Sequence, residues 1–554
     1  MPQFPKNKLA QQIIASCVAH HIKHVVISPG SRNAPLTIGF TNHPNIKTYS
    51  IVDERSAAFF ALGFAQQIKK PVAIVCTSGS ALLNYYPAVA EAFYSDIPLV
   101  VISADRPKHL IDIGDGQTVR QENVFQNHIL TTANLIADTA DNLNVIKHVL
   151  ETAIGKKGPV HINAPFDEPL YEVDDTMMVV EPINYKFVET PLEVDELQNY
   201  ATIWNSSEKK MVLIGSNYSS ELLQVQLNKI MQDPSVIVLT ETTSNVYHEG
   251  FINSIDQTIF PMTNDDLEKM RPDILLTLGG MIVSKRVKQF LRKHQPKHHW
   301  HVDSKKAFDT FFCLDRHFEI TPELFFSQFF FLTPNSFPGH LDYQKTWIEL
   351  KTQRKIKHKE YLDACEYSDL TVFETILKSL PNQTQLQLGN SSIIRYSQLF
   401  DVNESLKVFC NRGTSGIDGS TSTAIGASVA VENQTVFITG DVSFFYDSNG
   451  LWNDSIRNDF RIILINNNGG GIFKFIPGPQ KTNALNYFET PHGLTAEHLC
   501  KMFGFEYQQV SDLKEVKKGL NTFYAESEQP KLLEICTPSA ENDIILKQYF
   551  ASLK

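Results

Sequence analysis

Short apolar runs rich in Val, Ile and Leu alternate along the chain with longer helix-like segments, and polar, Gly or Pro residues follow each run. This alternation is typical of parallel α/β sheets, whose strands are buried on both faces. The runs form three sets of four, and each set predicts one sheet. They cover residues 24–28, 72–76, 99–103 and 160–165, then 211–215, 236–240, 274–279 and 300–303, and finally 386–389, 436–440, 462–468 and 532–536.

The three sets predict an α/β protein built from three doubly wound parallel-sheet domains. A chain of 554 residues is too long for a single core, which agrees with this number of domains. A linker-like stretch over 166–195 follows the first set, and a Phe-rich and then Lys-rich passage over 311–360 follows the second. We expect the domains to cover residues 1–185, 186–355 and 356–554.

Composition and charge argue against several classes of protein. With 50 Lys and Arg against 61 Asp and Glu, the net charge of -11 gives no basis for binding nucleic acid or an anionic membrane surface. The sequence has no run of about 18 apolar residues and no apolar leader, so we expect a cytoplasmic protein without stable membrane association. The seven cysteines are scattered without a CxxC pair, so neither a zinc site nor a disulfide framework is expected.

The strongest chemical signal lies at two strand ends of the third set, where the ligands of open α/β sheets gather. Gly440, Asp441 and Ser443 follow one strand, and Asn468 and Gly470 follow the next. Carboxylate, amide and backbone carbonyl oxygens from Asp441, Asn468 and Gly470 are hard ligands that suit Mg²⁺ or Mn²⁺. The pattern resembles the Gly-Asp…Asn-Asn motif that binds thiamin diphosphate, although two ordinary turns also use these residue types.

Glu54 opens an apolar, helix-like segment over residues 54–63 in the first predicted domain. Thiamin must lose its C2 proton, and the cofactor's own aminopyrimidine can remove it when a nearby carboxyl group shifts the tautomer of the ring. Apolar surroundings favour the protonated carboxyl group that such an exchange needs. We therefore predict that Glu54 activates the cofactor, while a carboxylate that only stabilises a helix N-terminus is the alternative.

Two further segments are candidates for walls of the cofactor site. Thr77, Ser78 and Gly79 follow the strand over 72–76 and are small enough to lie against a ligand. Ile417, within a Gly-rich stretch, is a candidate wedge that holds the cofactor bent, and simple core packing is its alternative.

Longer segments of the chain resemble one family of thiamin-diphosphate enzymes. The segments Ser28–Leu36, Val52–Arg55, Ser103–Pro107 and Asn411–Gly419 are similar to the 2-succinyl-5-enolpyruvyl-6-hydroxy-3-cyclohexene-1-carboxylate synthase family of menaquinone biosynthesis. This resemblance extends in the same order from about residue 20 to 480. It implies a reaction between 2-oxoglutarate and isochorismate, and pyrimidine-binding, central and diphosphate-binding domains. It also implies active sites assembled between subunits of a homodimer or a dimer of dimers.

The resemblance assigns roles to individual residues. It implies that Glu54, Arg32, Arg395 and Arg412 are catalytic, and that Asp441, Asn468 and Gly470 bind the metal. It implies cofactor contacts for Glu54, Thr77, Ser78, Gly79, Ser391, Ser415, Gly416, Ile417, Gly440, Asp441, Ser443 and Asn468. It implies isochorismate contacts for Ser31, Arg32, Arg106, Gln117, Lys285 and Arg286, and contacts to the succinyl carboxylate for Arg395 and Arg412.

The cationic residues also agree with the chemistry of the two substrates. Each substrate carries two carboxylates, so a site for both requires planar, bidentate cation donors. An arginine in a loop is more often solvated, and this alternative is strongest for Lys285 and Arg286, which lie in an ordinary amphipathic run. The addition step needs few protein acids or bases, so positioning and charge neutralisation are expected to carry most of the catalysis.

Two positions depart from the family pattern, and other functions stay open. Gly116 precedes Gln117 where the family has an Asn-Gln pair, so Asp115 is a candidate to supply the missing contact, and Ser80 replaces Thr.

A related lyase that forms acetolactate explains the cofactor residues but not the set of arginines. A catalytically silent scaffold with a regulatory site is a further alternative. No GxGxxG follows the strands of the central domain, so bound FAD is not expected there.

Overall fold

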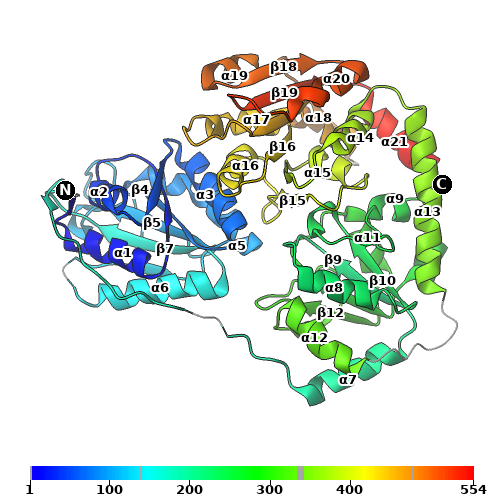
Figure 1. Ribbon diagram of the computed structural model, residues 1–554, viewed down its shortest axis with the longest axis horizontal. Coiled ribbons are helices and arrows are strands. Elements are labelled where there is room, and N and C mark those ends of the chain that lie inside the picture. The colour runs from blue at the N-terminus through cyan, green and yellow to red at the C-terminus, as the bar shows by residue number, and fades with distance from the viewer. Residues whose placement is uncertain (1–2, 138, 186–187, 334–341, 476–477) are drawn as a thin grey trace.

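The computed structural model describes residues 3–137, 139–185, 188–333, 342–475 and 478–554. It contains three fully parallel sheets of six, five and six strands, each with helices around it, so the predicted α/β class with three parallel-sheet units is confirmed. Figure 1 shows the first unit in blue and cyan, the second in green, and the third in yellow to red.

The first sheet has the order β3-β2-β4-β5-β7-β6. Its strands are β2 (His24–Ile27), β3 (Lys47–Ser50), β4 (Val72–Cys76), β5 (Leu99–Asp105), β6 (Thr132–Asn134) and β7 (Val160–Pro165). Its helices are α1 (Lys8–Ala19), α2 (Ala34–Asn42), α3 (Glu54–Ile68), α4 (Ser80–Asn84), α5 (Tyr86–Ser95), η1 (Lys108–Leu110) and α6 (Asn142–Lys156), and β1 (Phe4–Pro5) pairs with β8 (Val173–Asp174) in a small antiparallel sheet.

The second sheet has the order β10-β9-β11-β12-β13. Its strands are β9 (Lys210–Ile214), β10 (Val236–Thr240), β11 (Ile274–Leu278), β12 (His298–Val302) and β13 (Leu314–Phe318). The helices of this part are α7 (Val194–Ser206), α8 (Glu221–Ile230), η2 (Thr242–Ser244), α9 (Ile255–Ile259), α10 (Asn264–Met270), α11 (Lys285–Lys293), α12 (Pro322–Leu332) and α13 (Tyr343–Asp363).

The third sheet has the order β15-β14-β16-β17-β19-β18. Its strands are β14 (Gln385–Leu388), β15 (Lys407–Cys410), β16 (Thr435–Gly440), β17 (Arg461–Asn466), β18 (Glu506–Val510) and β19 (Lys531–Cys536). Its helices are α14 (Asp369–Ser379), α15 (Ser392–Ser397), α16 (Ser420–Val429), α17 (Asp441–Tyr446), η3 (Ser448–Leu451), η4 (Gly471–Lys474), η5 (Pro479–Lys481), α18 (Ala484–Glu489), α19 (Glu497–Phe503), α20 (Leu513–Phe523) and α21 (Asn542–Ser552).

Every apolar run of the sequence forms a strand, and the strands of the three parallel sheets that the runs do not mark all lie at sheet edges. These are β3, β6, β13, β15 and β18. An edge strand has one neighbour and is partly solvated, so it carries polar residues that break the apolar pattern. In β18, for example, only Val510 is buried.

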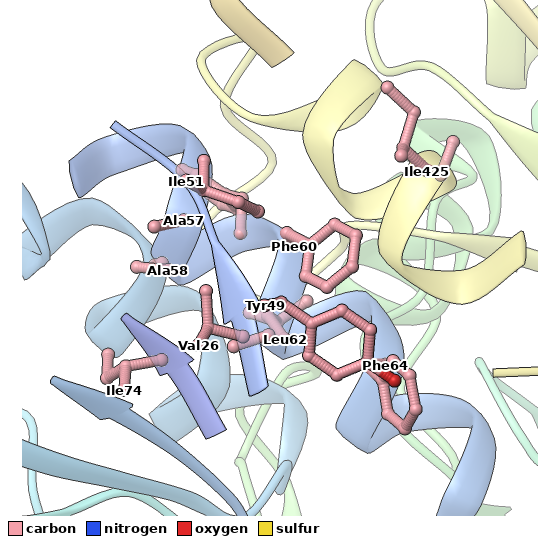
Figure 2. Close-up of a cluster of buried hydrophobic side chains, with 14 of the residues drawn as sticks. Val26, Tyr49, Ile51, Ala57, Ala58, Phe60, Leu62, Phe64, Ile74 and Ile425 are labelled. Carbon is pink, nitrogen blue, oxygen red and sulfur yellow. The ribbon is translucent and has the colours of Figure 1, made fainter. Parts of the chain in front are cut away.

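The first and third units share one hydrophobic core. Helix α3 packs on α16, and buried residues of both units, including Phe60 and Ile425, belong to the same cluster. Figure 2 shows Phe60 projecting from α3 toward the helix that carries Ile425. The helices approach closely because both contain glycine, since a Cβ at Gly63 would lie 2.0 Å from the carbonyl oxygen of Thr423.

Helix α13 connects the second and third units (Figure 1). Near its start, the Tyr343 hydroxyl donates to the Met270 carbonyl, and near its end the Tyr361 hydroxyl donates to the Ile545 carbonyl. The predicted boundary between residues 355 and 356 therefore falls within a continuous helix. The other predicted boundary involves residue 186, which lies outside the described residues. Both boundaries stay predictions.

Among the described residues, none of the helices combines the length and the apolar character that crossing a membrane requires.

Candidate active site

The parallel strands β16 and β17 are neighbours, and this pairing brings the two strand-end motifs together. Asp441 is the first residue of α17 and is 3% exposed. Its carboxylate accepts hydrogen bonds from the backbone N–H of Val442 at 2.7 Å and from that of Gly469 at 2.9 Å. Two segments that are separated along the sequence thus form one site at the carboxyl edge of the sheet.

The turn after β17 has a backbone that favours Asn and Gly. Asn468 has a φ of 61°, and its carbonyl accepts a hydrogen bond from the N–H of His492 at 3.4 Å. Gly469 has a φ of 146°, and a Cβ there would lie 2.5 Å from the carbonyl oxygen of Glu489. The N–H of Gly470 donates to the same oxygen at 2.6 Å. The last residue of α18, Glu489, and the segment that follows it therefore contact the predicted metal-binding turn beside Asp441.

The electrostatics of this site favour a bound cation. Burial raises the pKa of the Asp441 carboxyl group, and hydrogen bonds from Val442 and Gly469 oppose that shift. Burial also raises the pKa of the nearby Asp369 to about 6, and Asp369 accepts a hydrogen bond from the Asn467 side chain at 3.1 Å. A cation beside Asp441 would offset the cost of keeping this carboxylate ionised.

The loop that carries Ile417 lies against the same site. The Ser443 hydroxyl donates to the Ile417 carbonyl at 3.1 Å, and the Asn390 side chain donates to the Gly416 carbonyl at 2.7 Å. Ser391 and Ser415 both have positive φ, at 68° and 61°. The hydrogen bond from Ser443 therefore attaches the loop of Gly416 and Ile417 to α17, the helix that begins at Asp441.

Glu54 lies where the sequence predicts it, at the first position of α3, and is half-buried. The Asp53 side chain caps this helix by accepting from the N–H of Ser56 at 3.2 Å. Asp53 also accepts from the Asn449 side chain at 2.8 Å, so the start of α3 is attached to the third unit. The Asn84 side chain is 3.5 Å from the Glu54 carboxylate.

Arg32 and Thr77 belong to a second group of predicted site residues, at the carboxyl edge of the first sheet. The N–H of Arg32 donates to the Thr77 hydroxyl at 3.3 Å, and its guanidinium donates to the Phe166 carbonyl at 3.0 Å. Burial lowers the pKa of Arg32, and the positive charge of Arg106 adds to this effect. Arg106 itself lies 3.7 Å from Asp115. The two arginines thus place neighbouring positive charges beside the loop at Thr77.

The remaining predicted residues of this group lie around Gly79. Gly79 has a φ of 90°, and its N–H donates to the Gln121 side chain at 2.9 Å. The carbonyl oxygen of Gln117 would lie 3.3 Å from a Cβ at Gly79, so the two loops are in contact. Ser31 is exposed, and the hydroxyl of Ser78 is buried without a hydrogen-bond partner among the described residues.

Lys285, Arg286 and Arg395 line one cavity of about 250 Å³ between the second and third units. Ile472 and Phe475 are among the apolar residues that also line it. The cavity is also lined by the carboxyl group of Asp256, and a ligand contact of Lys285 and Arg286 stays a prediction.

The position of Lys285 and Arg286 at the start of α11 is electrostatically unfavourable for the helix, because its N-terminus is positive. Two buried carboxylates lie beneath this turn. Glu241 accepts from the N–H of Ser284 at 2.7 Å, and Asp256 accepts from the Ser284 hydroxyl. Burial raises the pKa of Glu241 to about 7, and burial also raises the pKa of Asp256. The positive charges of Arg286 and Arg395 lower the pKa of Asp256 against the effect of burial, so this carboxyl group is a neighbour of the cations at the start of α11.

Arg395 and Arg412 are neighbours with the same charge. Arg395 donates to the carbonyl of Ser391 at 2.5 Å, and Arg412 donates to the side-chain oxygen of Asn390 at 2.8 Å. Burial lowers the pKa of Arg395, and Arg412 lowers it further. Both hydrogen-bond partners are neutral and do not offset the two positive charges, whereas the carboxyl group of Asp256 raises the pKa of Arg395.

Comparison with known proteins decides the family. Residues 7–134 match a model described as the thiamine pyrophosphate enzyme N-terminal TPP binding domain. Residues 184–388 match the middle domain of thiamine pyrophosphate, and residues 388–535 match the C-terminal TPP binding domain. A 2-succinyl-5-enolpyruvyl-6-hydroxy-3-cyclohexene-1-carboxylate synthase of Flavobacterium johnsoniae is 54% identical, covering 99% of this chain and 100% of that protein. A protein with the same name from Flavobacterium psychrophilum is 52% identical, covering 99% of this chain and 100% of that protein. Another from Bacteroides thetaiotaomicron is 36% identical, covering 100% of both chains.

The chain belongs to this synthase family. It is therefore an enzyme that uses thiamin diphosphate, and the family predicted from sequence segments is confirmed.

Within this synthase family member, the structure adds residues that the sequence patterns do not single out. The Asn390 side chain donates hydrogen bonds to both ends of the loop from Asn411 to Gly416. Asn390 lies two residues after the end of β14, and the ends of parallel strands are where ligands bind in open α/β sheets, so its position in the sequence could have indicated it. Gln121 holds the N–H of Gly79, and His492 lies 3.4 Å from the Asp441 carboxylate. Neither of these two lies next to a recognisable motif.

Proposed function

We propose that this enzyme releases CO₂ from 2-oxoglutarate and adds the succinyl fragment to isochorismate in menaquinone biosynthesis. The product is 2-succinyl-5-enolpyruvyl-6-hydroxy-3-cyclohexene-1-carboxylate. The observation that carries this proposal is the cavity at which Lys285, Arg286 and Arg395 meet from two structural units. Both substrates are dicarboxylates, so a site with several lysine and arginine side chains suits them. An acetolactate-forming relative would not need this concentration of positive charge.

The metal and the diphosphate are assigned to the third unit. Asp441, Asn468 and the Gly470 carbonyl would hold Mg²⁺, and Mn²⁺ prefers the same oxygen ligands. The raised pKa of the buried Asp441 carboxyl group and the glycine-dependent turn at Gly469 support this assignment. The residues that would surround the diphosphate are Ser391, Ser415, Gly416, Gly440 and Ser443. When bound, thiamin diphosphate supplies the carbanion-stabilising chemistry that protein side chains lack.

The aminopyrimidine end of the cofactor is assigned to Glu54 and the loop over Thr77, Ser78 and Gly79. Glu54 would hold a proton at its carboxyl group for the ring nitrogen that faces it. The unpartnered hydroxyl of Ser78 and the close approach of Gly79 to Gln117 support a ligand at this loop. Ile417 would support the bend between the two rings.

The substrate carboxylates are assigned to two groups of cations. Ser31, Arg32, Arg106, Gln117, Lys285 and Arg286 would bind isochorismate. Arg395 and Arg412 would bind the distal carboxylate of 2-oxoglutarate and orient its keto carbon. In support, the Nε donors of Arg32, Arg106 and Arg412 are buried without a hydrogen-bond partner in the described part of the chain. A bound carboxylate would satisfy such donors.

The complete site is proposed to require two copies of the chain, in a homodimer or a dimer of dimers. Within one chain, no hydrogen bond or ion pair between described residues joins Glu54, Arg32 or Arg106 to Asp441 or Asn468. A second copy would bring the pyrimidine-binding group of one chain to the diphosphate-binding group of the other.

The proposal is tested by following isochorismate depletion with purified protein, 2-oxoglutarate, thiamin diphosphate and Mg²⁺. Depletion is expected only when all four components accompany isochorismate, and one CO₂ should be released for each isochorismate consumed. Depletion at the full rate without 2-oxoglutarate would refute the reaction.

A further inference from the structure

We infer that Glu91 is a positioning residue that holds the loop of residues 411–417, which carries Arg412 and Ile417, from the neighbouring unit of the same chain. The inference rests on the proposed function, because the substrate contact of Arg412 is part of it. Glu91 lies on α5 in the first unit, and the loop follows β15 in the third.

The carboxylate of Glu91 has four hydrogen-bond donors. One oxygen accepts from the N–H of Gly413 and from the Ser95 hydroxyl, each at 2.7 Å. The other accepts from the N–H of Thr414 at 2.6 Å and from its hydroxyl at 2.9 Å. Glu91 is only 1% exposed, so this charge depends on these donors rather than on water.

Helix α5 and the loop are in direct contact at Gly413. A Cβ at Gly413 would lie 2.7 Å from the backbone carbonyl of Glu91 and 2.8 Å from the Ser95 hydroxyl. Only a residue without a side chain therefore allows the loop to approach the helix this closely. The N–H groups of two successive residues then point at one carboxylate, which suits a charged acceptor better than a neutral amide.

The other anchors of the loop belong to the third unit itself. The Asn390 side chain donates to the carbonyls of Asn411 at 2.8 Å and Gly416 at 2.7 Å, and Ser443 donates to that of Ile417. Glu91 holds the middle of the loop, between these two ends. Its removal would leave both ends attached while the central peptides, which follow Arg412 directly, lose their acceptor.

The position of Arg412 depends on this central contact. The peptide that joins Arg412 to Gly413 donates to Glu91, while the Arg412 guanidinium donates to Asn390. Backbone and side chain are thus fixed by two different structural units. An error of about 1 Å in a substrate-binding group lowers rates strongly, so loosening the backbone should weaken the use of 2-oxoglutarate.

The test is Glu91→Gln in the full-length chain with thiamin diphosphate and Mg²⁺. We expect the KM for 2-oxoglutarate to rise about tenfold, as for a buried N–H that loses its acceptor, while the KM for isochorismate changes less than about twofold. The control is Glu189→Gln, because Glu189 also accepts from the N–H and the hydroxyl of one threonine, Thr321, but lies in the second unit. This control should keep wild-type kinetics.

A double-mutant cycle separates positioning from a general loss of stability. In an Arg412→Met background, Glu91→Gln should change the KM for 2-oxoglutarate less than about twofold further, because the group that Glu91 positions is already absent. Equal increases in both KM values, or the same tenfold effect in both backgrounds, would overturn the inference.

Two further measurements test the inference if Glu91→Gln does not fold or if the wild type does not consume isochorismate. If Glu91→Gln does not fold, Thr414→Val removes one donor and should raise the KM for 2-oxoglutarate about threefold, and an unchanged KM would contradict the inference. If the wild type does not consume isochorismate, the proposed function fails, but the inference is still tested by calorimetry. Because Ile417 lies on the same loop, Glu91→Gln should weaken thiamin diphosphate binding severalfold and Glu189→Gln should not, and equal affinities would refute it.

Discussion

Gly426 of α16 lies so close to Phe60 of α3 that a Cβ at Gly426 would be 1.9 Å from the Phe60 carbonyl oxygen. The contact is between backbones, so no side-chain rotation can relieve it. It joins the first and third structural units through their shared core.

Gly426→Ala should therefore destabilise the protein. We expect the free energy of unfolding to fall by about 2 kcal/mol or more, because overpacking outweighs the gain of up to about 1 kcal/mol that Ala has over Gly in a helix. Urea denaturation followed by circular dichroism measures this change. The control is Gly116→Ala, since a Cβ at Gly116 has no atom of a described residue within 4 Å and should alter stability by less than about 0.5 kcal/mol. Equal effects of the two substitutions would contradict the packing argument.

Asp447 should make stability depend on pH. Its carboxylate accepts from the N–H of Ser422 at 2.7 Å, and burial raises its pKa from 3.8 to about 7. Between these values the folded chain holds a proton that the unfolded chain releases, so this contribution is complete below pH 3.8 and is lost as pH rises to about 7. Asp447→Asn should gain stability relative to the wild type over this interval, by up to about 1.4 kcal/mol per pH unit. Parallel stability curves would show that Asp447 does not titrate in this way.

Asp441→Ala should separate cofactor binding from folding. If Asp441 is the charged metal ligand that we propose, its loss should weaken thiamin diphosphate binding in the presence of Mg²⁺ at least about hundredfold, as expected when a buried charge pair is broken. Isothermal calorimetry measures the affinity, and far-UV circular dichroism should show an intact fold. Wild-type affinity in this variant would exclude Asp441 from the metal site.

Glu54→Gln should impair activation of the cofactor more than its binding. The variant keeps the shape of the side chain but has no acidic proton to share, so turnover should drop on the order of a few hundredfold, or roughly 3–4 kcal/mol. Cofactor affinity should change far less, because the residues that we propose to contact the diphosphate belong to another structural unit. Hydrogen–deuterium exchange at C2 of bound thiamin diphosphate measures activation directly. Exchange at the wild-type rate would mean that Glu54 is structural.

Mixing the two inactive variants tests whether the site needs two chains. If Glu54 of one chain works with Asp441 of the other, a hybrid dimer of Glu54→Gln and Asp441→Ala has one site with both defects and one site with neither. Co-expression should therefore restore activity, and light scattering should show no active monomer. An inactive mixture with proven hybrid dimers would place both residues of each site in one chain.

The sequence by itself identifies the central strands and the family. Runs such as those that form β4 and β17 are apolar on both faces because both faces are covered, and this pattern is visible without any tertiary information. The two strand-end turns at Asp441 and Asn468 and the helix start at Glu54 are likewise visible as local patterns, although the pairing of β16 with β17 is what brings the two turns together.

Only the tertiary structure decides which distant groups meet. Edge strands such as β18 are defined by the neighbour that they pair with, because their own residues are largely polar. From the sequence alone, Lys285 and Arg286 belong to the solvated face of a helix. The fold brings Arg395 to the same cavity as these two residues. Glu91 reads as a polar residue of an amphipathic helix, and its four donors include two N–H groups more than 300 positions away along the chain. Contacts of this kind depend on the packing of whole units against each other, so no local pattern of residues encodes them.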